Sequence, residues 1–138
     1  MFLTFLILFR QPFNFILKGG SKNYLTQQLD HFDSHSSSNF SQIYYTYQVK
    51  PGVNPNSLIF YLGSEDVPNT DFSYLAIQYA EKTGSPLFAL EHRFFGSSFP
   101  EGNEYELTKD NLLQYLTIPQ VLNDIAVFIN KMRKSFCE

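Results

Sequence analysis

Apolar runs separated by polar loops predict a sheet in the middle of the chain. Residues 42–49 carry Ile, Tyr, Thr and Val in loose alternation, which is typical of a strand. Residues 58–62 and 87–90 are continuous apolar runs, the second introduced by Pro86. Such runs are typical of strands that are buried on both faces of a parallel sheet covered by helices.

A helix is expected between the two continuous runs. Apolar residues recur there at helical spacing, at Phe72, Leu75, Ala76, Tyr79 and Ala80. Asp71 is placed to cap its first turn, and Gly84 is placed for a left-handed residue after its last turn. Strand, helix and strand in this order predict a βαβ unit with a right-handed crossover.

The pattern after Thr117 predicts the clearest helix. Thr117 to Gln120 fits a capping box, with Pro119 in the first turn. One apolar stripe follows, made of Val121, Leu122, Ile125, Ala126, Phe128, Ile129 and Met132. We expect Asp124 and the neighbouring polar residues mostly on the opposite, solvent-facing side.

Composition and charge narrow the function classes. The 138 residues are 43% hydrophobic and 17% charged, so the chain has enough apolar material for one core. The net charge of −3 provides no basic surface, which argues against nucleic acid as a partner. The single cysteine, Cys137, allows neither an internal disulfide nor a thiolate zinc site. We expect no metal site and no cofactor.

The amino-terminal stretch favours a secretory leader. Phe2 to Phe9 form an apolar run of signal-peptide length that is too short for a stable membrane span, and residues 1–21 are interpreted as a leader. No basic residue precedes the run, so a misplaced start or a buried strand is the alternative. Asn39-Phe40-Ser41 is an N-glycosylation sequon, which agrees with this route.

Two loops are candidates for binding chemistry because both leave predicted parallel strands at their carboxyl ends. The first is Gly63-Ser64-Glu65-Asp66, whose backbone N–H groups are candidate donors to an oxyanion. From the local sequence alone, an ordinary strand-to-helix turn is the favoured interpretation. The second is Glu91-His92-Arg93, for which we expect a structural ion-pair cluster, with His92 as a general base the weaker alternative.

The sequence contains no hydrolase nucleophile of the kind expected on such a sheet. No Gly-Ser pair belongs to a G-x-S-x-G elbow, and all three histidines precede residue 93. We assign no catalytic residue to the chain.

Several segments resemble one family of serine peptidases. Gln27-Gln28-Leu29-Asp30-His31-Phe32 looks like its Q-x-L-D-H-F motif. Further similar segments follow in the same order, at residues 40–45, 59–65, 90–100, 112–117 and 122–129. The chain is thus similar, from Tyr24 to Phe136, to the family that contains Pro-Xaa carboxypeptidase, dipeptidyl peptidase II and thymus-specific serine protease. Ser64-Glu65-Asp66 depart from the Gly or Asn, Glu, Gly that the family usually has.

The resemblance implies an α/β fold, with residues 22–138 forming the first part of an α/β-hydrolase sheet. That part comprises a β-hairpin and a parallel βαβ unit with flanking helices, and it stops before the nucleophile elbow. The resemblance also implies a serine exopeptidase that takes proline-containing peptides, forms homo-oligomers at full length, and is secreted or lysosomal. On this basis we expect the chain to be an inactive amino-terminal fragment; the alternative is a non-catalytic secreted peptide-binding or interaction module derived from the same fold.

Overall fold

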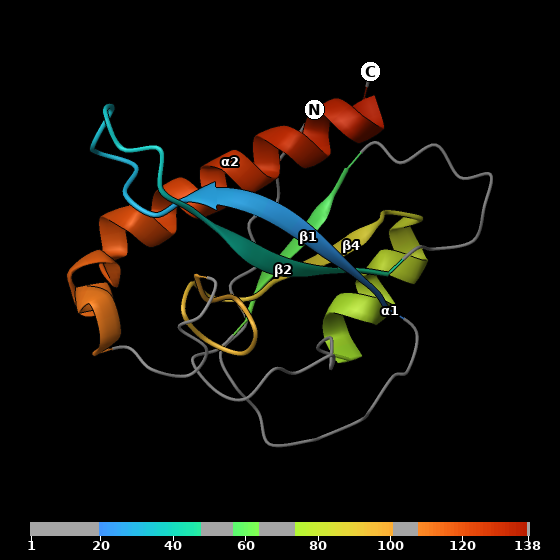
Figure 1. The fold of residues 1–138 in the computed structure, drawn as a ribbon. Helices are drawn as coiled ribbons and strands as arrows, with labels where there is room; N and C mark the ends of the chain where they lie inside the picture. Colours follow the sequence, from blue (N-terminus) through green and yellow to red (C-terminus); the bar gives the residue numbers. More distant parts are fainter. Residues whose placement is uncertain (1–19, 48–56, 64–73, 101–107, 138) are drawn as a thin grey trace.

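A four-stranded mixed sheet with a helix on each face forms the fold (Figure 1). The computed structural model describes residues 20–47, 57–63, 74–100 and 108–137. The elements are β1 (Ser21–Gln28), β2 (Asn39–Tyr47), β3 (Ile59–Leu62), α1 (Tyr74–Thr83), β4 (Leu87–Leu90), the short 3-10 helix η1 (Lys109–Tyr115) and α2 (Ile118–Cys137).

The strand order β1-β2-β4-β3 confirms the predicted hairpin and βαβ unit. β1 pairs antiparallel with β2 along its whole length, from Ser21 opposite Thr46 to Gln28 opposite Asn39. β2 is also antiparallel to β4, whereas β3 and β4 are parallel. The sheet therefore changes from antiparallel to parallel pairing at β4, and α1 connects its two parallel strands.

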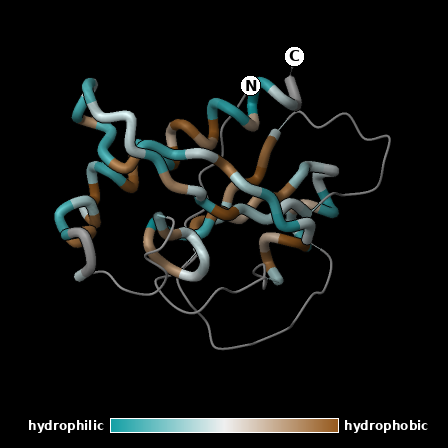
Figure 2. Tube along the Cα trace, in the orientation of Figure 1, coloured by the Kyte–Doolittle hydropathy of each residue, from teal (hydrophilic) through white to brown (hydrophobic). Residues whose placement is uncertain are grey.

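Alternating side chains divide the core into two layers, one on each face of the sheet. On one face Ile43, Ile59 and Leu87 pack against Ala76 and Ala80 of α1. On the other face the neighbouring strand residues pack against α2, and these are Leu25, Tyr44, Phe60, Phe88 and Leu90. All four residues of β4 are buried, as its continuous apolar run predicts. Figure 2 shows apolar residues concentrated on the central strands and the inner sides of the helices.

The end of α1 agrees with the sequence. Gly84 has a φ of 67° directly after the last helical residue, and Ser85 donates its N–H to the Ala80 carbonyl. This is the left-handed termination for which glycine is preferred. Asp71 and Phe72, predicted at the start of this helix, lie outside the described residues. The helix η1 was not anticipated, because it has little apolar periodicity of its own.

The pattern misplaces three residues of α2. Leu122 is 59% exposed and Ala126 is exposed as well, although both belong to the predicted core stripe. Asp124 is fully buried, although the pattern places it on the solvent side. The capping-box partner Gln120 is also buried, and its side chain bonds to the β1–β2 turn rather than back to the start of the helix. A polar strip on α2 is therefore part of the interior.

Candidate functional site

The carboxyl ends of β3 and β4 lie side by side. Leu62 is in register with Leu90, and the N–H of Gly63 donates to the Leu90 carbonyl at 2.7 Å. A Cβ atom at Gly63 would lie 3.1 Å from that carbonyl oxygen and 3.4 Å from the Glu91 Cα atom. Glycine thus allows the first candidate loop to start directly against the second one, as the parallel arrangement predicts.

The Gly63 N–H cannot also serve an oxyanion, because the sheet already uses it. Ser64, Glu65 and Asp66, the other members of this candidate loop, lie outside the described residues. The oxyanion role of the loop therefore stays a prediction, and it rests on those three residues alone.

Arg93 forms its ion pair with Asp124 of α2. The guanidinium Nε donates to Asp124 Oδ2 at 2.7 Å, and Nη2 donates to Oδ1 at 2.8 Å. Both residues are fully buried. The sequence predicts that Arg93 pairs within the Glu91-His92-Arg93 cluster. In the described part of the chain no ion pair joins Glu91 to Arg93, and the partner of Arg93 is Asp124. A two-point contact of this kind fixes the guanidinium in orientation as well as in position.

The remaining N–H groups of Arg93 are also occupied. Nη1 donates to the carbonyls of Leu29 and Tyr115, at 3.1 and 2.8 Å, and Nη2 donates to the Gln28 carbonyl at 3.3 Å. All five donors of the guanidinium therefore have acceptors. The Arg93 Cζ atom also lies over the Phe40 ring, 5.4 Å from its centroid. A side chain so fully committed to the interior has no donor left for a substrate carboxylate.

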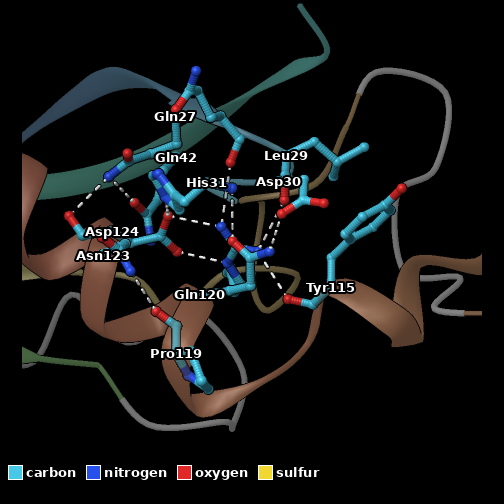
Figure 3. Close-up of polar contacts among 12 residues, drawn as sticks. Gln27, Leu29, Asp30, His31, Gln42, Tyr115, Pro119, Gln120, Asn123 and Asp124 are labelled. Atoms are coloured by element: carbon cyan, nitrogen blue, oxygen red, sulfur yellow. Dashed lines mark hydrogen bonds and ion pairs between the residues drawn. The ribbon is translucent and has the colours of Figure 1, made fainter. Parts of the chain in front are cut away.

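Asp124 also holds the turn between β1 and β2 (Figure 3). His31 Nε2 lies 2.7 Å from Asp124 Oδ1, and the His31 N–H donates to Gln120 Oε1 at 2.9 Å. Gln120 Nε2 in turn donates to Asp30 Oδ1 at 2.6 Å. The N–H of Phe32 and then the Gln120 amide hold the pKa of Asp30 below its ordinary value. We call Arg93, Asp124, His31, Gln120 and Asp30 the clasp.

The His31–Asp124 pair has the geometry of a catalytic carboxylate–histidine couple, but its surroundings favour a structural role. In a catalytic couple the carboxylate stabilises the imidazolium that forms during proton transfer. Here both oxygens of Asp124 already accept charged hydrogen bonds from Arg93, which balances the carboxylate charge. The His31 side chain is only 6% exposed. We therefore assign the clasp to tertiary structure.

Glu91 occupies a second buried polar site, made of neutral donors. Tyr45 donates its hydroxyl to Oε1 at 3.1 Å, while Oε2 accepts from the Ser97 N–H at 3.1 Å and the Ser98 hydroxyl at 2.8 Å. Gly96, with a φ of 62°, lies against the carboxylate. The loop after β4 thus folds around its own carboxylate, in the manner of an anion-binding turn.

Tyr45 gives this site a testable pH dependence. Burial, and then the nearby Glu91 carboxylate, raise the pKa of Tyr45 to about 12 from 10.0. Between those pH values the unfolded chain loses a proton that the folded chain keeps, so stability falls as pH rises. Tyr45→Phe should be less stable by about 1 kcal/mol at neutral pH, yet lose less stability over that alkaline range. Urea unfolding of the parent chain and of Tyr45→Phe across this pH range measures how steeply each free energy of unfolding falls with pH. An equally steep fall in the two proteins would contradict the assignment.

His92 is the half-buried member of the Glu91-His92-Arg93 segment. Its Nδ1 lies 3.1 Å from the Arg93 carbonyl oxygen, and its ring packs edge-to-face on Phe95 with centroids 5.2 Å apart. The structure places it beside Gly63 at the shared strand ends, where the backbone nitrogen of His92 lies 3.8 Å from a Cβ built on that glycine. No described residue supplies a carboxylate partner that would orient His92 as a general base.

Sequence reasoning missed the clasp residues Asp124 and Gln120 and the Glu91 partners Tyr45 and Ser98. One signal was present for α2: Gln120, Asp124 and Phe128 follow at intervals of four, so the carboxylate shares a helix face with a core residue. A buried arginine also demands an acidic partner.

Two further features are absent from the described ranges. None of the helices there is long and apolar enough to cross a bilayer. No group of three or more histidine, cysteine, aspartate or glutamate side chains there is arranged to hold a metal ion.

Comparison with known proteins places this arrangement in a family. The model of the family described as serine carboxypeptidase S28 matches residues 27–138. A Caenorhabditis elegans protein named "Putative serine protease F56F10.1" is 36% identical to this chain over 118 residues. The aligned residues cover 80% of this chain and 20% of that protein. Human lysosomal Pro-X carboxypeptidase is 30% identical over 125 residues, which cover 87% of this chain and 24% of the enzyme.

The chain thus spans about a fifth to a quarter of the length of these relatives. The family match nevertheless includes both strand-end loops and every residue of the clasp, from Asp30 and His31 to Asp124. The resemblance seen in the sequence motifs is confirmed: the chain belongs to the serine carboxypeptidase S28 family, whose members have an α/β-hydrolase fold.

Proposed function

We propose that this chain forms the amino-terminal part of the peptide-binding edge of a proline-directed serine exopeptidase. The observation that carries the proposal is the family match over residues 27–138, which contains both loops at the shared strand ends. The names of the lysosomal Pro-X carboxypeptidases among its relatives support the substrate class. Peptides are then the substrates, and no cofactor takes part.

The topology supports a location for the reactive part. α1 crosses from β3 to β4 on one face of the sheet, and α2 follows β4 on the other face. When two right-handed crossovers lie on opposite faces of a sheet, they place their next strands in opposite directions across it. A strand following α2 would therefore be added on the side of β3 that faces away from β4. None of the described strands pairs with that edge of β3. Its carboxyl end would lie next to Gly63.

The proposal assigns the nucleophile and base to polypeptide beyond these 138 residues, since the sequence has no G-x-S-x-G elbow. Without a triad, a hydrolase of this type retains only about 10³–10⁴-fold catalysis over water even when all else is intact. The proposed route is secretory or lysosomal, with residues 1–21 as leader. The exposed Asn39 at the start of β2 supports glycosylation there.

A chimera tests this function. Residues 27–138 would replace the aligned segment of human lysosomal Pro-X carboxypeptidase, and hydrolysis of a Pro-Xaa peptide would be measured with and without a serine-reactive reagent. We expect reagent-sensitive hydrolysis by the chimera and none above buffer by the 138-residue chain. The matched control is the chimera with its nucleophilic serine changed to alanine.

Two results would contradict the proposal. A folded chimera that hydrolyses no proline-containing peptide would refute the assigned role of the segment. Serine-reagent-sensitive turnover by the 138-residue chain alone would show that a nucleophile had been overlooked within it.

A further inference from the structure

Within the loop after β4, the two charged neighbours of His92 are turned inward. Glu91 accepts hydrogen bonds from Tyr45, Ser97 and Ser98. Arg93 has all its donors occupied by the clasp and by backbone carbonyls. Neither can contact a bound molecule without breaking these contacts. His92 lies between them, is half-buried rather than buried, and has a ring nitrogen, Nε2, to which no described residue hydrogen-bonds.

The hydrogen bond of the other ring nitrogen defines what Nε2 offers. Nδ1 faces the Arg93 carbonyl oxygen at 3.1 Å, and a carbonyl oxygen only accepts hydrogen bonds. In the neutral ring, Nδ1 therefore carries the proton and Nε2 presents a bare lone pair. Such a nitrogen accepts a hydrogen bond from an N–H or O–H group, and it repels a carboxylate.

The loop holds this acceptor in a fixed place. Phe94 has a φ of 62°, a conformation costly for a bulky residue, and its N–H donates to the Ser98 carbonyl at 2.8 Å. The Ser98 hydroxyl in turn accepts from the Ile43 N–H at 2.9 Å, which ties the loop to β2. The Phe95 ring packs against the imidazole itself. An acceptor already ordered before binding loses little conformational entropy when a ligand arrives.

We propose that Nε2 of His92 accepts a hydrogen bond from a backbone N–H of an extended peptide bound at the carboxyl ends of β3 and β4. This assignment rests on the proposed function, and it makes His92 a substrate-binding residue rather than a general base. Proline has no backbone N–H. The donor must therefore belong to a residue of the peptide other than its proline.

Binding of acetyl-Ala-Pro-Phe to the full 138-residue chain tests the assignment, with the same peptide N-methylated at its Ala and Phe amides as the matched probe. Nitrogen NMR of ¹⁵N-histidine-labelled chain would report the two ring nitrogens of His92, identified by their loss in His92→Phe. We expect the ¹⁵N chemical shift of Nε2 to be that of a ring nitrogen without a proton. This shift should change when the unmethylated peptide is added and stay the same when the N-methylated peptide is added. His92→Phe should bind that peptide about tenfold more weakly, and His92→Gln should recover part of the loss.

The control is His35→Phe, a change at an exposed histidine in the β1–β2 turn that should leave binding unchanged. Equal affinity of His92→Phe and the parent chain, a protonated Nε2, or no binding of the peptide at all would each overturn the assignment. None of these outcomes affects the chimera assay, in which hydrolysis would still support the proposed function. Hydrolysis by the chimera carrying His92→Phe at unchanged KM would likewise reject His92 and leave the function standing.

Discussion

Arg93→Met is expected to lower the free energy of unfolding by about 3–5 kcal/mol, the range typical of breaking a buried ion pair from one side. The change leaves the Asp124 carboxylate buried without its cation. It also removes the donors to the carbonyls of Leu29 and Tyr115. Because single domains are stable by only about 5–15 kcal/mol, the variant should unfold at a much lower urea concentration than the parent chain. Urea unfolding of both chains, followed by circular dichroism, measures the difference.

Matched variants separate the ion pair from general damage to the core. Asp124→Asn should cost a similar amount, because it leaves a buried guanidinium without its anion. The double variant Arg93→Met/Asp124→Asn should lose several kcal/mol less than the sum of the two single losses, since it leaves no unpaired charge. Lys131→Met, on the exposed side of α2, should change stability by no more than about 0.5 kcal/mol. Additive losses would show that the two charges do not stabilise the fold as a pair.

The clasp explains why this loss would affect the whole molecule. Arg93 contacts residues that are 31, 64 and 65 positions away along the chain. These contacts tie the end of β1, the loop after β4, η1 and α2 to a single guanidinium. Because one guanidinium makes all of these contacts, we expect the loop at the strand ends to be ordered only when α2 is docked on the sheet.

Local periodicity was sufficient to predict β2, β3, β4, the βαβ unit and the two long helices, whereas β1 was expected only through the hairpin that the family resemblance implies. The continuous run at 87–90 predicted a strand buried on both faces, and Gly84 predicted the end of α1. The adjacency of Gly63 and Glu91 followed from parallel pairing alone, and the structure confirms it. Each of these features depends on residues close in sequence or on a general rule of sheet topology.

The partners of the buried charges were not predictable in the same way. Asp124 looks like a solvent-facing residue because helical patterning assigns every carboxylate to the polar side. Its burial depends on Arg93 and His31, which come from other elements and have no fixed spacing to α2. Sequence proximity pointed instead to Glu91 as the partner of Arg93, although that carboxylate turns to Tyr45 and Ser98. Pairing among buried charges follows tertiary geometry, which a single sequence does not encode locally.

Gly96→Ala, a change in the loop after β4, should lower the free energy of unfolding by about 2–4 kcal/mol. One part is backbone strain, because Gly96 has a φ of 62° and a left-handed alanine costs roughly 1–2 kcal/mol. The other part is a collision, since the new Cβ would lie 2.8 Å from Glu91 Oε2. Moving that carboxylate breaks its bonds to Ser97 and Ser98, and an unsatisfied buried acceptor costs about 1–3 kcal/mol.

Gly84→Ala isolates the strain from the collision. Gly84 has nearly the same φ, 67°, at the end of α1, so its alanine variant should lose only the strain of about 1–2 kcal/mol. Glu91→Ala should cost stability by itself, yet in the Gly96→Ala background it removes the collision, so the double variant should lose less than the two single losses together. Urea unfolding measures the free energy of unfolding of all four variants. If Gly96→Ala loses no more stability than Gly84→Ala, the Glu91 carboxylate does not hold this loop in place.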